Sequence, residues 1–331
     1  MKNISVYLPK KDYLNEATEY YIEMLIGGID CDFIGYFYSL KDIKHHDNVL
    51  VIDAKSLVFI KLRYPLKRVI TWYQGVVPEE ALMVFESRFR YYYWSFFEFI
   101  SLKLSSWNFF VSTAMVTHYQ KKYRIHITNK TIIPCFNKQM NKDIIYETAD
   151  KYKYLTFVYA GSLHKWQCVE QTLEIFKRLN DIHSDSQFFL YTFDVEEAKK
   201  MVKNIGVKNV TISRSSLEEI DYKISKCHYG FLVRDDNVVN NVATPTKLST
   251  YLSVGTKPIM TNVIHDFESC LNLSNAVIYE NMTSIDNIVK AIMTNYNNGM
   301  SVDDLVVDYE TAFSDYYNRK HYQNIISKIS L

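Results

Sequence analysis

The sequence lacks several patterns that mark common classes of protein. Its five cysteines are scattered singly, without metal-type spacing, which is typical of reduced thiols in a cytosolic protein. No apolar run reaches the roughly 18 residues of a membrane-spanning helix. The N-terminal MKNISVYLPKKDY has no apolar stretch of signal-peptide length. A net charge of +1 gives no reason to expect nucleic acid as a partner. We therefore expect a cytoplasmic protein.

A dinucleotide-binding fingerprint is also missing. No G-x-G-x-x-G motif follows the first predicted strand, residues 4–8, which argues against a dinucleotide-dependent dehydrogenase. Internal repeats and low-complexity segments are absent too. The 331 residues, 48% hydrophobic and 23% charged, have the composition of an ordinary globular protein. This length suffices for two domains that each bury a core.

Strand-like and helix-like runs alternate along residues 1–140. Strands are predicted at residues 4–8, 32–38, 49–53, 69–73, 109–112 and 131–134, and helices at 13–25, 55–63 and 79–104, with a further helix ending at 123. Such alternation implies parallel strands joined by crossover helices, hence an α/β fold. Ligands in such sheets bind outside the C-terminal ends of the strands.

The same alternation resumes after a polar, charge-rich segment, residues 136–153, that suits an interdomain linker. Strands are predicted there at residues 155–159, 188–192, 210–212, 229–233, 258–260 and 276–279, and helices at 168–179, 195–205, 285–296 and within 303–330. The capping box Ser216-x-x-Glu219 predicts the start of another helix. The pattern indicates a second α/β domain.

One short helix is well marked between the strands at 229–233 and 258–260. Thr244 can cap it, and Pro245 suits the first helical position because its backbone angle is fixed. Gly255 lies where a left-handed C-cap is needed. The N-terminus of this helix is expected to point at whatever lies above the C-terminal ends of the strands.

Several residues of this second half are suited to bind phosphate. The amides of Thr246 and Lys247 at the helix start attract anions, and the Lys247 ammonium adds a positive charge. Gly161 directly follows a strand and lets the backbone approach a phosphate closely. Arg234, at the C-terminal edge of another strand, can donate two hydrogen bonds to a diphosphate.

The segment P-T-K-L-S-T-Y-L-S-V-G-T-K-P-I, residues 245–259, resembles the donor-site helix of family 4 glycosyltransferases of the GT-B fold. It is most similar to bacterial members that build capsular or O-antigen polysaccharide. The resemblance implies two Rossmann-like parallel-sheet domains that face a cleft. Residues 1–145 would form the acceptor-side domain and residues 154–305 the nucleotide-sugar domain, with residues 306–331 returning as helix to the first.

The resemblance also implies an activity. A member of this family moves a hexose from a nucleotide diphosphate sugar, here expected to be a UDP-sugar, to a sugar hydroxyl of a polysaccharide or lipid-linked oligosaccharide, with retention of configuration. It requires no further cofactor and no metal. Pro245 and Thr246 would hold the diphosphate, while Arg234 and Lys247 would stabilise the charge that develops on it during the reaction.

Some positions depart from the family pattern. Thr250 stands where the family has a ribose-binding glutamate, and Val242 stands where it has a second one. The ribose contact would therefore fall to Thr250 itself, and Asp235 and Asp236 are candidates to bind ribose or sugar hydroxyls in place of the glutamates. A solvated turn is the alternative interpretation of these two aspartates.

The family's diphosphate-binding Arg and Lys are changed as well. Their positions are Ser162 and Gln167, and Lys165 of the same loop is a candidate to supply the charge from a shifted place. Arg214, just after the strand at 210–212, is a candidate contact to the base or ribose, with a solvated loop arginine as the alternative.

Acceptor contacts are expected in TWYQGVVPEE, residues 71–80, where relatives of this type place a substrate loop. Tyr73, Gln74, Gly75 and Glu80 are the candidates. The family often has a histidine at the position of Gln74, and we include Gln74 among the catalytic candidates. A glutamine can bind sugar hydroxyls but cannot act as a general base near neutral pH.

The predicted helix at 79–104 is crowded with Phe, Tyr and Trp, interrupted by charged residues. Two interpretations remain open. It is either a core helix with a broad apolar face, or an aromatic and basic face that rests on a membrane carrying a lipid-linked acceptor. The second interpretation implies peripheral contact with the inner face of the plasma membrane.

Two other functions also remain open for a chain of this fold. The changed acidic and basic motifs would suit a catalytically silent subunit that binds a partner enzyme. A sugar-nucleotide epimerase would need acid–base residues beside the sugar, and no clear His or carboxylate pair is evident.

Overall fold

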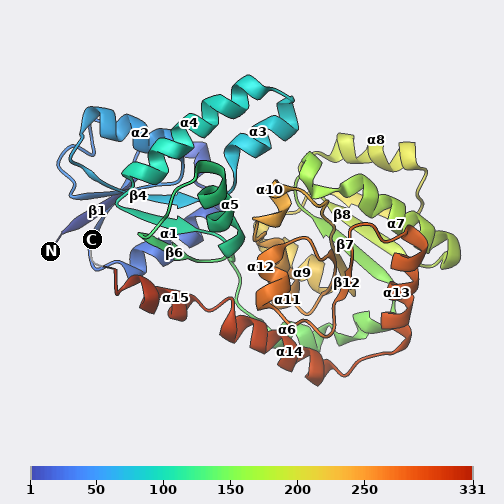
Figure 1. Ribbon diagram of the computed structural model, residues 1–331. Coiled ribbons are helices and arrows are strands. Elements are labelled where there is room, and N and C mark those ends of the chain that lie inside the picture. The colour runs from blue at the N-terminus through green and yellow to red at the C-terminus, as the bar shows by residue number, and fades with distance from the viewer. Residues whose placement is uncertain (1, 330–331) are drawn as a thin grey trace. The chain divides into compact units, whose positions relative to one another are not determined.

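The computed structural model describes residues 2–329 (Figure 1). These residues form two compact units. The first contains the chain as far as Asn137, the short segment Asn241–Thr244 and the residues from Asn318 onward. The second contains Lys138–Asn240 and Pro245–Tyr317.

Each unit is built on a six-stranded sheet with strictly parallel neighbours. The first has the order β2-β1-β3-β4-β5-β6 and the second β12-β11-β10-β7-β8-β9. The strands of the first are β1 (Asn3–Tyr7), β2 (Asp32–Phe37), β3 (Asn48–Val51), β4 (Arg68–Tyr73), β5 (Trp107–Phe110) and β6 (Lys130–Ile132). Those of the second are β7 (Thr156–Ala160), β8 (Gln187–Tyr191), β9 (Val210–Ser213), β10 (Tyr229–Leu232), β11 (Lys257–Thr261) and β12 (Val277–Tyr279). The predicted α/β architecture with parallel strands is confirmed.

Helices connect the strands of the first unit, and several begin at a side-chain cap. The side chains of Asn15, Asp53 and Ser112 each accept a hydrogen bond from the amide three residues ahead. The helices are η1 (Lys11–Tyr13), α1 (Glu16–Gly28), α2 (Ala54–Arg63), α3 (Val77–Phe85), α4 (Arg88–Leu104), α5 (Thr113–Tyr123) and α15 (Arg319–Ile326).

The remaining helices belong mainly to the second unit. Ser216 opens α9 by accepting from the amide of Glu219, as its capping-box sequence predicts. The helices are α6 (Lys142–Glu147), η2 (Ala149–Lys153), η3 (Lys165–Gln167), α7 (Val169–Ile182), α8 (Val195–Ile205), α9 (Leu217–Ser225), α10 (Val238–Asn241), α11 (Lys247–Ser253), α12 (His265–Cys270), α13 (Ile285–Asn297) and α14 (Val302–Asp315).

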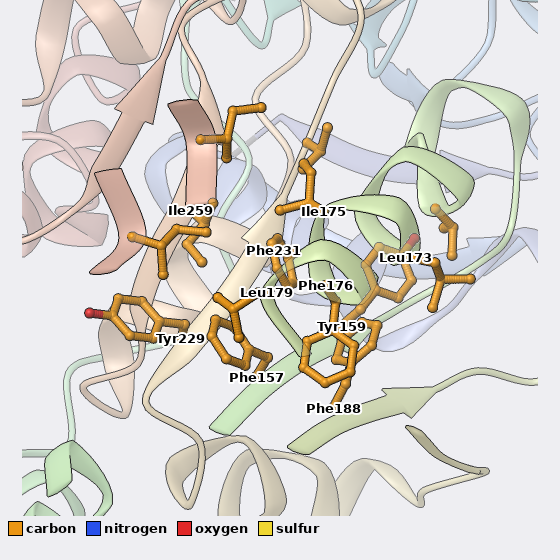
Figure 2. Close-up of a cluster of buried hydrophobic side chains, with 14 of the residues drawn as sticks. Phe157, Tyr159, Leu173, Ile175, Phe176, Leu179, Phe188, Tyr229, Phe231 and Ile259 are labelled. Atoms are coloured by element: carbon orange, nitrogen blue, oxygen red, sulfur yellow. The ribbon is translucent and has the colours of Figure 1, made fainter. Parts of the chain in front are cut away.

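Aromatic side chains of the central strands form the core of the second unit (Figure 2). Phe157 of β7 stacks on Tyr229 and Phe231 of β10, with ring centroids 5.4 and 5.6 Å apart. Phe176 of α7 packs on Phe188 of β8 at 5.2 Å. Burial on both faces explains why β10 carries no charged residue.

The prediction of one continuous helix over 79–104 is wrong. The segment forms two helices, α3 and α4, packed as a hairpin. Glu86 adopts a left-handed backbone with φ of 51°, which ends α3. The Ser87 hydroxyl then accepts from the Arg90 amide at 3.4 Å and begins α4. Aromatic residues on both sides of Glu86 and Ser87 conceal this break.

The predicted start of the helix after Thr244 is also wrong, because α11 begins at Lys247. Thr244 is buried in the first unit, where its hydroxyl accepts from the Cys135 amide at 3.0 Å and donates to the Val111 carbonyl at 3.3 Å. Thr244 therefore anchors the chain before α11 instead of capping it. The predicted C-cap is confirmed, since Gly255 has a left-handed φ of 73°.

Residues 138–153, predicted as part of a linker, fold onto the second unit as α6 and η2. Lys151 of η2 is buried, and its ammonium donates to the carbonyls of Ser225 and Val254 at 2.9 and 2.8 Å. Both carbonyls lie at the C-terminal ends of helices, where a cation is favourable. A polar, charge-rich composition does not reveal that the ammonium of Lys151 is buried.

The C-terminal helix α15 packs on α1 in the first unit. Gly28 makes the contact close, because a Cβ at this position would lie 2.7 Å from the Cβ of Ile326. At the neighbouring Gly27, the nearest atom would be the flexible end of the Gln323 side chain at 2.8 Å. Of the two C-terminal helices, α15 belongs to the first unit and α14 to the second.

Substitution of these two glycines tests the contact. Gly28→Ala is expected to lower the free energy of unfolding by about 1–3 kcal/mol, as overpacking a rigid contact does. Gly27→Ala is expected to leave stability unchanged or to raise it by up to about 1 kcal/mol, because alanine favours a helix. Urea denaturation measures both. Equal effects of the two substitutions would contradict close packing of α15 at Gly28.

Candidate functional site

The C-terminal ends of three strands lie level at one edge of the second sheet. Ala160 of β7 pairs with Tyr191 of β8, and Tyr191 pairs with Ser213 of β9. The loops that follow these strands therefore leave the sheet side by side. This is the edge at which parallel sheets bind ligands.

A cavity of about 280 Å³ lies at this edge. Its walls combine aromatic and aliphatic side chains with a few hydroxyl groups and backbone. The lining residues are Ala160, Gly161, Ser162, Tyr191, Thr192, Phe193, Ser215, Ser216, Leu217 and Ile220. The volume is near the lower end of the roughly 300–1,000 Å³ of small-molecule sites, so it suits one planar ring system better than a whole nucleotide sugar.

Lys247 reaches the strand end beside this cavity from α11. Its ammonium donates to Gln167 Oε1 at 3.1 Å and lies 3.6 Å from the centre of the Tyr159 ring. Burial, together with the nearby Arg234 guanidinium, holds the pKa of Lys247 well below its usual value. Gln167 occupies the position where the resemblance implies a lysine, and it here orients Lys247 instead.

Gly161 is the reason that Lys247 fits. Its φ of 148° is a backbone conformation that residues with a side chain rarely adopt, and its amide donates to the Tyr191 carbonyl at 2.9 Å. A Cβ at this position would lie 3.3 Å from Lys247 Nζ. That Gly161 lets the backbone approach a phosphate closely stays a prediction, since the near neighbour here is Lys247.

Arg234 follows β10 and is 3% exposed. Its guanidinium donates to the Trp166 carbonyl at 2.8 Å, and its backbone is fixed on both sides by the Thr261 hydroxyl. Burial lowers the pKa of Arg234, while Tyr159 and Cys168 nearby work in the opposite direction. One guanidinium edge is thus held by the loop before α7.

The two cations are close enough for one to lower the pKa of the other. Among residues 2–329, the ion pairs with carboxylates include neither Arg234 nor Lys247. Buried cations are costly unless they are compensated. An anion that binds between them would gain two charge-assisted contacts and relieve their repulsion.

The remaining donor-site candidates lie around this pair and the cavity. Ser162 lines the cavity and accepts the Tyr159 hydroxyl at 2.6 Å through its carbonyl. Lys165 is exposed in η3, and Arg214 is exposed at the cavity rim, where its Nε donates to the Phe193 carbonyl at 3.2 Å.

The candidates of α11 and its preceding loops differ in their surroundings. Pro245 and Thr246 are half-buried just before α11, and the Thr250 hydroxyl donates to the Thr246 carbonyl at 3.2 Å. Asp235 and Asp236 are exposed after β10. Asp235 lies beside Cys168, whose pKa is raised to about 11 by burial and by this carboxylate.

The acceptor-side candidates belong to the first unit, and the structure corrects one of them. Tyr73 is buried, with its hydroxyl 2.7 Å from Ser101 and its ring stacked on Phe110, so it is a core residue instead of a substrate contact. Gln74 is exposed at the end of β4. Glu80 lies directly against Gly75, where a Cβ would collide with its carboxylate, and burial raises the pKa of Glu80.

A buried charge network beside these residues escaped the sequence analysis. Glu79 accepts from His118 at 3.0 Å and from Lys122 at 2.8 Å. Lys122 also donates to Glu98 at 2.9 Å, and the Tyr123 hydroxyl donates to the same carboxylate. Burial raises the pKa of Glu98, whereas His118 and Lys122 outweigh burial at Glu79 and lower its pKa. The network ties α3, α4 and α5 together.

The sequence indicated some residues of the donor site and of the acceptor-side loop, but not the contacts that these residues make with others far away in the chain. The strand ends and Gly161 could be predicted, while the cavity residues Phe193, Leu217 and Ile220 carry no motif. The available signals were that Phe193 directly follows a predicted strand and that Leu217 and Ile220 lie in the first turn and a half of the helix that Ser216 opens. Glu98 offered one signal for the charge network, because it is a carboxylate between Phe97 and Phe99 in the aromatic part of α4.

Comparisons with known proteins concern the fold. No protein-family model and no curated protein sequence matches the chain. Among solved structures, HepE of Anabaena in complex with UDP-glucose is similar with a TM-score of 0.72 and 10% identity, over 99% of each chain. WaaG, a glycosyltransferase involved in lipopolysaccharide biosynthesis, is similar with a TM-score of 0.65 and 11% identity, over 98% of this chain and 100% of its own.

A third similar structure is TarM of S. aureus, solved with fondaparinux, α-GlcNAc-glycerol and UDP. The TM-score is 0.60 with 10% identity, and the match covers 87% of this chain but only 58% of TarM. These similarities, together with the two parallel sheets, confirm the predicted GT-B fold class. At such low identities they establish the fold alone.

The conformation at Gly161 provides a test of the site's architecture. Gly161→Ala is expected to lower the free energy of unfolding by about 1–3 kcal/mol, since it forces a strained backbone and displaces Lys247. Gly299→Ala is the matched control, because Gly299 also has a positive φ, 64°, but has no atom within 4 Å of the added Cβ. Chemical denaturation compares the two. A loss at Gly161 no larger than that at Gly299 would contradict the close approach to Lys247.

Proposed function

We propose that the protein is a glycosyltransferase that moves a hexose from a nucleotide diphosphate sugar, a UDP-sugar, to a sugar hydroxyl. The observation that carries the proposal is the pair of neighbouring cations, the buried Arg234 and the half-buried Lys247, beside a cavity at the strand ends of the second unit. Nucleotide diphosphates combine the two matching features, a planar base and a doubly charged phosphate group. The GT-B fold and similar structures solved with UDP or UDP-glucose support the assignment.

In this proposal the base enters the cavity between Phe193 and Leu217. The diphosphate lies over Gly161, where the backbone leaves room, and within reach of the Lys247 ammonium. Arg234 donates from the edge of its guanidinium that is not used by Trp166. Arg214 and the exposed Asp235 are proposed contacts to ribose or sugar.

The proposed chemistry follows from where charge develops. As the bond between the sugar C1 and the β-phosphate oxygen breaks, negative charge builds on the phosphate, and the two cations stabilise it. The acceptor oxygen forms the new bond to C1, and its proton passes to the departing phosphate oxygen. This course retains the configuration at C1 and requires no protein nucleophile. It assigns binding and charge stabilisation to the chain's own side chains.

The acceptor, in this proposal, is a saccharide of a cell-surface polysaccharide or of a lipid-linked precursor, reached on the cytoplasmic side. Gln74 and Glu80 of the first unit are the proposed contacts. WaaG, with its stated role in lipopolysaccharide biosynthesis, supports this class of acceptor. The family 4 assignment and a capsule or O-antigen product remain part of the proposal.

Isothermal titration with UDP, GDP and ADP tests the donor site. UDP is expected to bind, and Arg234→Lys is expected to weaken it by about 10-fold or more, because a charge-assisted hydrogen bond contributes about 1.5–3 kcal/mol. Arg178→Lys is the matched control, since Arg178 pairs with Asp286 on the helical surface. Failure of all three nucleotides to bind, or equal losses in both variants, would refute the assignment.

A pH dependence follows from Lys247. Because the pKa of Lys247 is depressed, its ammonium loses a proton in the free protein at a lower pH than its ordinary pKa of about 10.5 implies. A bound diphosphate favours the charged form. UDP affinity should therefore fall as the pH rises through the alkaline range toward that ordinary value, with proton uptake on binding. The terminal phosphate of UDP, with a second pKa near 6, does not titrate in this window.

The dependence should disappear in Lys247→Met, while Lys165→Met keeps it. Cys168, with a pKa of about 11, and Tyr159, whose pKa is raised by burial, do not account for it. Calorimetry in buffers of different ionisation enthalpy measures the proton uptake. A pH-independent affinity in the unmodified protein would contradict the role of Lys247.

A catalytically silent subunit is the second candidate, favoured by Ser162 and Gln167 at the positions where the resemblance implies a cation pair. Release of UDP from UDP-sugars with and without saccharide acceptors separates the two. Acceptor-dependent release identifies a transferase, whereas tight binding without turnover on any acceptor identifies the silent subunit.

A further inference from the structure

The outer surface of α4 is the least expected feature of the first unit. Phe89, Tyr92 and Phe96 are 79%, 68% and 59% exposed, and their spacing of three and four residues places them in one stripe on the helix. Phe85 at the end of α3 extends the stripe across the hairpin turn. No helix among residues 2–329 is long and apolar enough to span a bilayer.

Two polar residues of α4, Glu98 and Ser101, face the opposite way. Glu98 is 3% exposed and holds Lys122 and Tyr123 of α5, and Ser101 is buried against Tyr73. The helix is therefore inverted, with its carboxylate inside and its aromatic rings in solvent. Its rotation is fixed by the charge network, because an unpaired buried carboxylate would be costly. Large apolar patches exposed in this manner mark interaction sites.

The charges on this surface are predominantly positive. Arg88, Arg90 and Lys103 are exposed, whereas Glu86 is the one exposed acid of residues 77–104. The Arg90 guanidinium lies 4.0 Å from the centre of the Phe85 ring, so cation and aromatic side chains form one mixed surface.

The surface continues onto α2. The Lys55 ammonium lies 5.6 Å from the ring centres of both Tyr93 and Trp94, and Phe59 of α2 is exposed beside Phe97. In Figure 1 the α3–α4 hairpin, in blue-green to cyan, extends beyond the strands of the first sheet.

We propose that the α3–α4 hairpin, residues 77–104, docks on the surface of an anionic lipid bilayer. The aromatic stripe enters the boundary between head groups and acyl chains, where Phe, Tyr and Trp side chains are favourable. Arg88, Arg90 and Lys103 meet the phosphates of the anionic lipids. An acidic protein would satisfy the charges, but a bilayer satisfies both the charge and a flat apolar stripe along a straight helix.

The α3–α4 surface and anionic lipids would together make the peripheral membrane contact that the sequence leaves open. It does not depend on the donor site, because vesicle binding requires neither nucleotide nor acceptor. Failure of UDP to bind and failure of vesicles to bind are therefore separate results.

Co-sedimentation of the full chain with vesicles tests the proposal. Vesicles of phosphatidylcholine alone are compared with vesicles that also contain phosphatidylglycerol. The protein should sediment with the second kind, and salt should weaken its binding. Phe89→Ser combined with Phe96→Ser is expected to reduce binding at least about 10-fold. Arg88→Glu combined with Arg90→Glu is expected to reduce it at least about 25-fold, at about fivefold per lost cation.

Matched controls come from the second unit. Tyr154→Ser removes an exposed aromatic ring and Lys200→Glu reverses an exposed cation, and neither should alter binding. All substituted side chains are exposed, and circular dichroism verifies that the variants fold.

Three results would overturn the proposal. The protein could remain in the supernatant with anionic vesicles, or the aromatic and arginine variants could bind as well as the unmodified chain. Alternatively, light scattering could show a dimer that Phe89→Ser with Phe96→Ser dissociates while no vesicle binding occurs, which would make this surface an interface between two copies of the chain.

Discussion

The site in the second unit depends on two cations at one sheet edge, the buried Arg234 and the half-buried Lys247. Arg234 is fixed by the Trp166 carbonyl and Thr261, and Lys247 by Gln167 and the Tyr159 ring. Their hydrogen-bond partners are neutral, so the positive charge is oriented without being neutralised. Such an arrangement costs free energy in the empty protein and recovers it when an anion binds. The parallel sheet makes it possible, because it brings the ends of β7 and β10 together and leaves Gly161 free of a side chain.

The first unit uses buried charge for a different purpose. Glu79, Glu98, His118 and Lys122 compensate one another within one network, and this network fixes how the α3–α4 hairpin packs. Its consequence is the exposed aromatic stripe of α4. We propose that the incompletely compensated charge of the second unit binds a diphosphate. In the first unit, the compensated charge leaves an apolar surface exposed, and we propose that this surface meets an anionic bilayer. Both proposals thus follow from where ionised groups are buried.

The fold could be predicted from the sequence much further than the site. Alternating apolar runs determined the parallel strands, and local chemistry determined the left-handed cap at Gly255 and the capping box at Ser216, because these signals involve residues close in sequence. Thr244 misled the prediction, since its hydroxyl is used by Cys135, which is 109 residues away in the chain. The cavity and the contact between Lys247 and Gln167 depend on similarly distant segments. The break at Glu86 was hidden because a left-handed residue there has no glycine or proline to mark it.

The central claim is that a diphosphate binds between Arg234 and Lys247 with its base in the adjoining cavity. A crystal structure of the protein with UDP tests it most directly. The account predicts the base between Phe193 and Leu217, and phosphate oxygens within hydrogen-bond distance of Lys247 Nζ and the Arg234 guanidinium. Density for UDP elsewhere on the chain, with both cations still held only by Gln167 and Trp166, would contradict it.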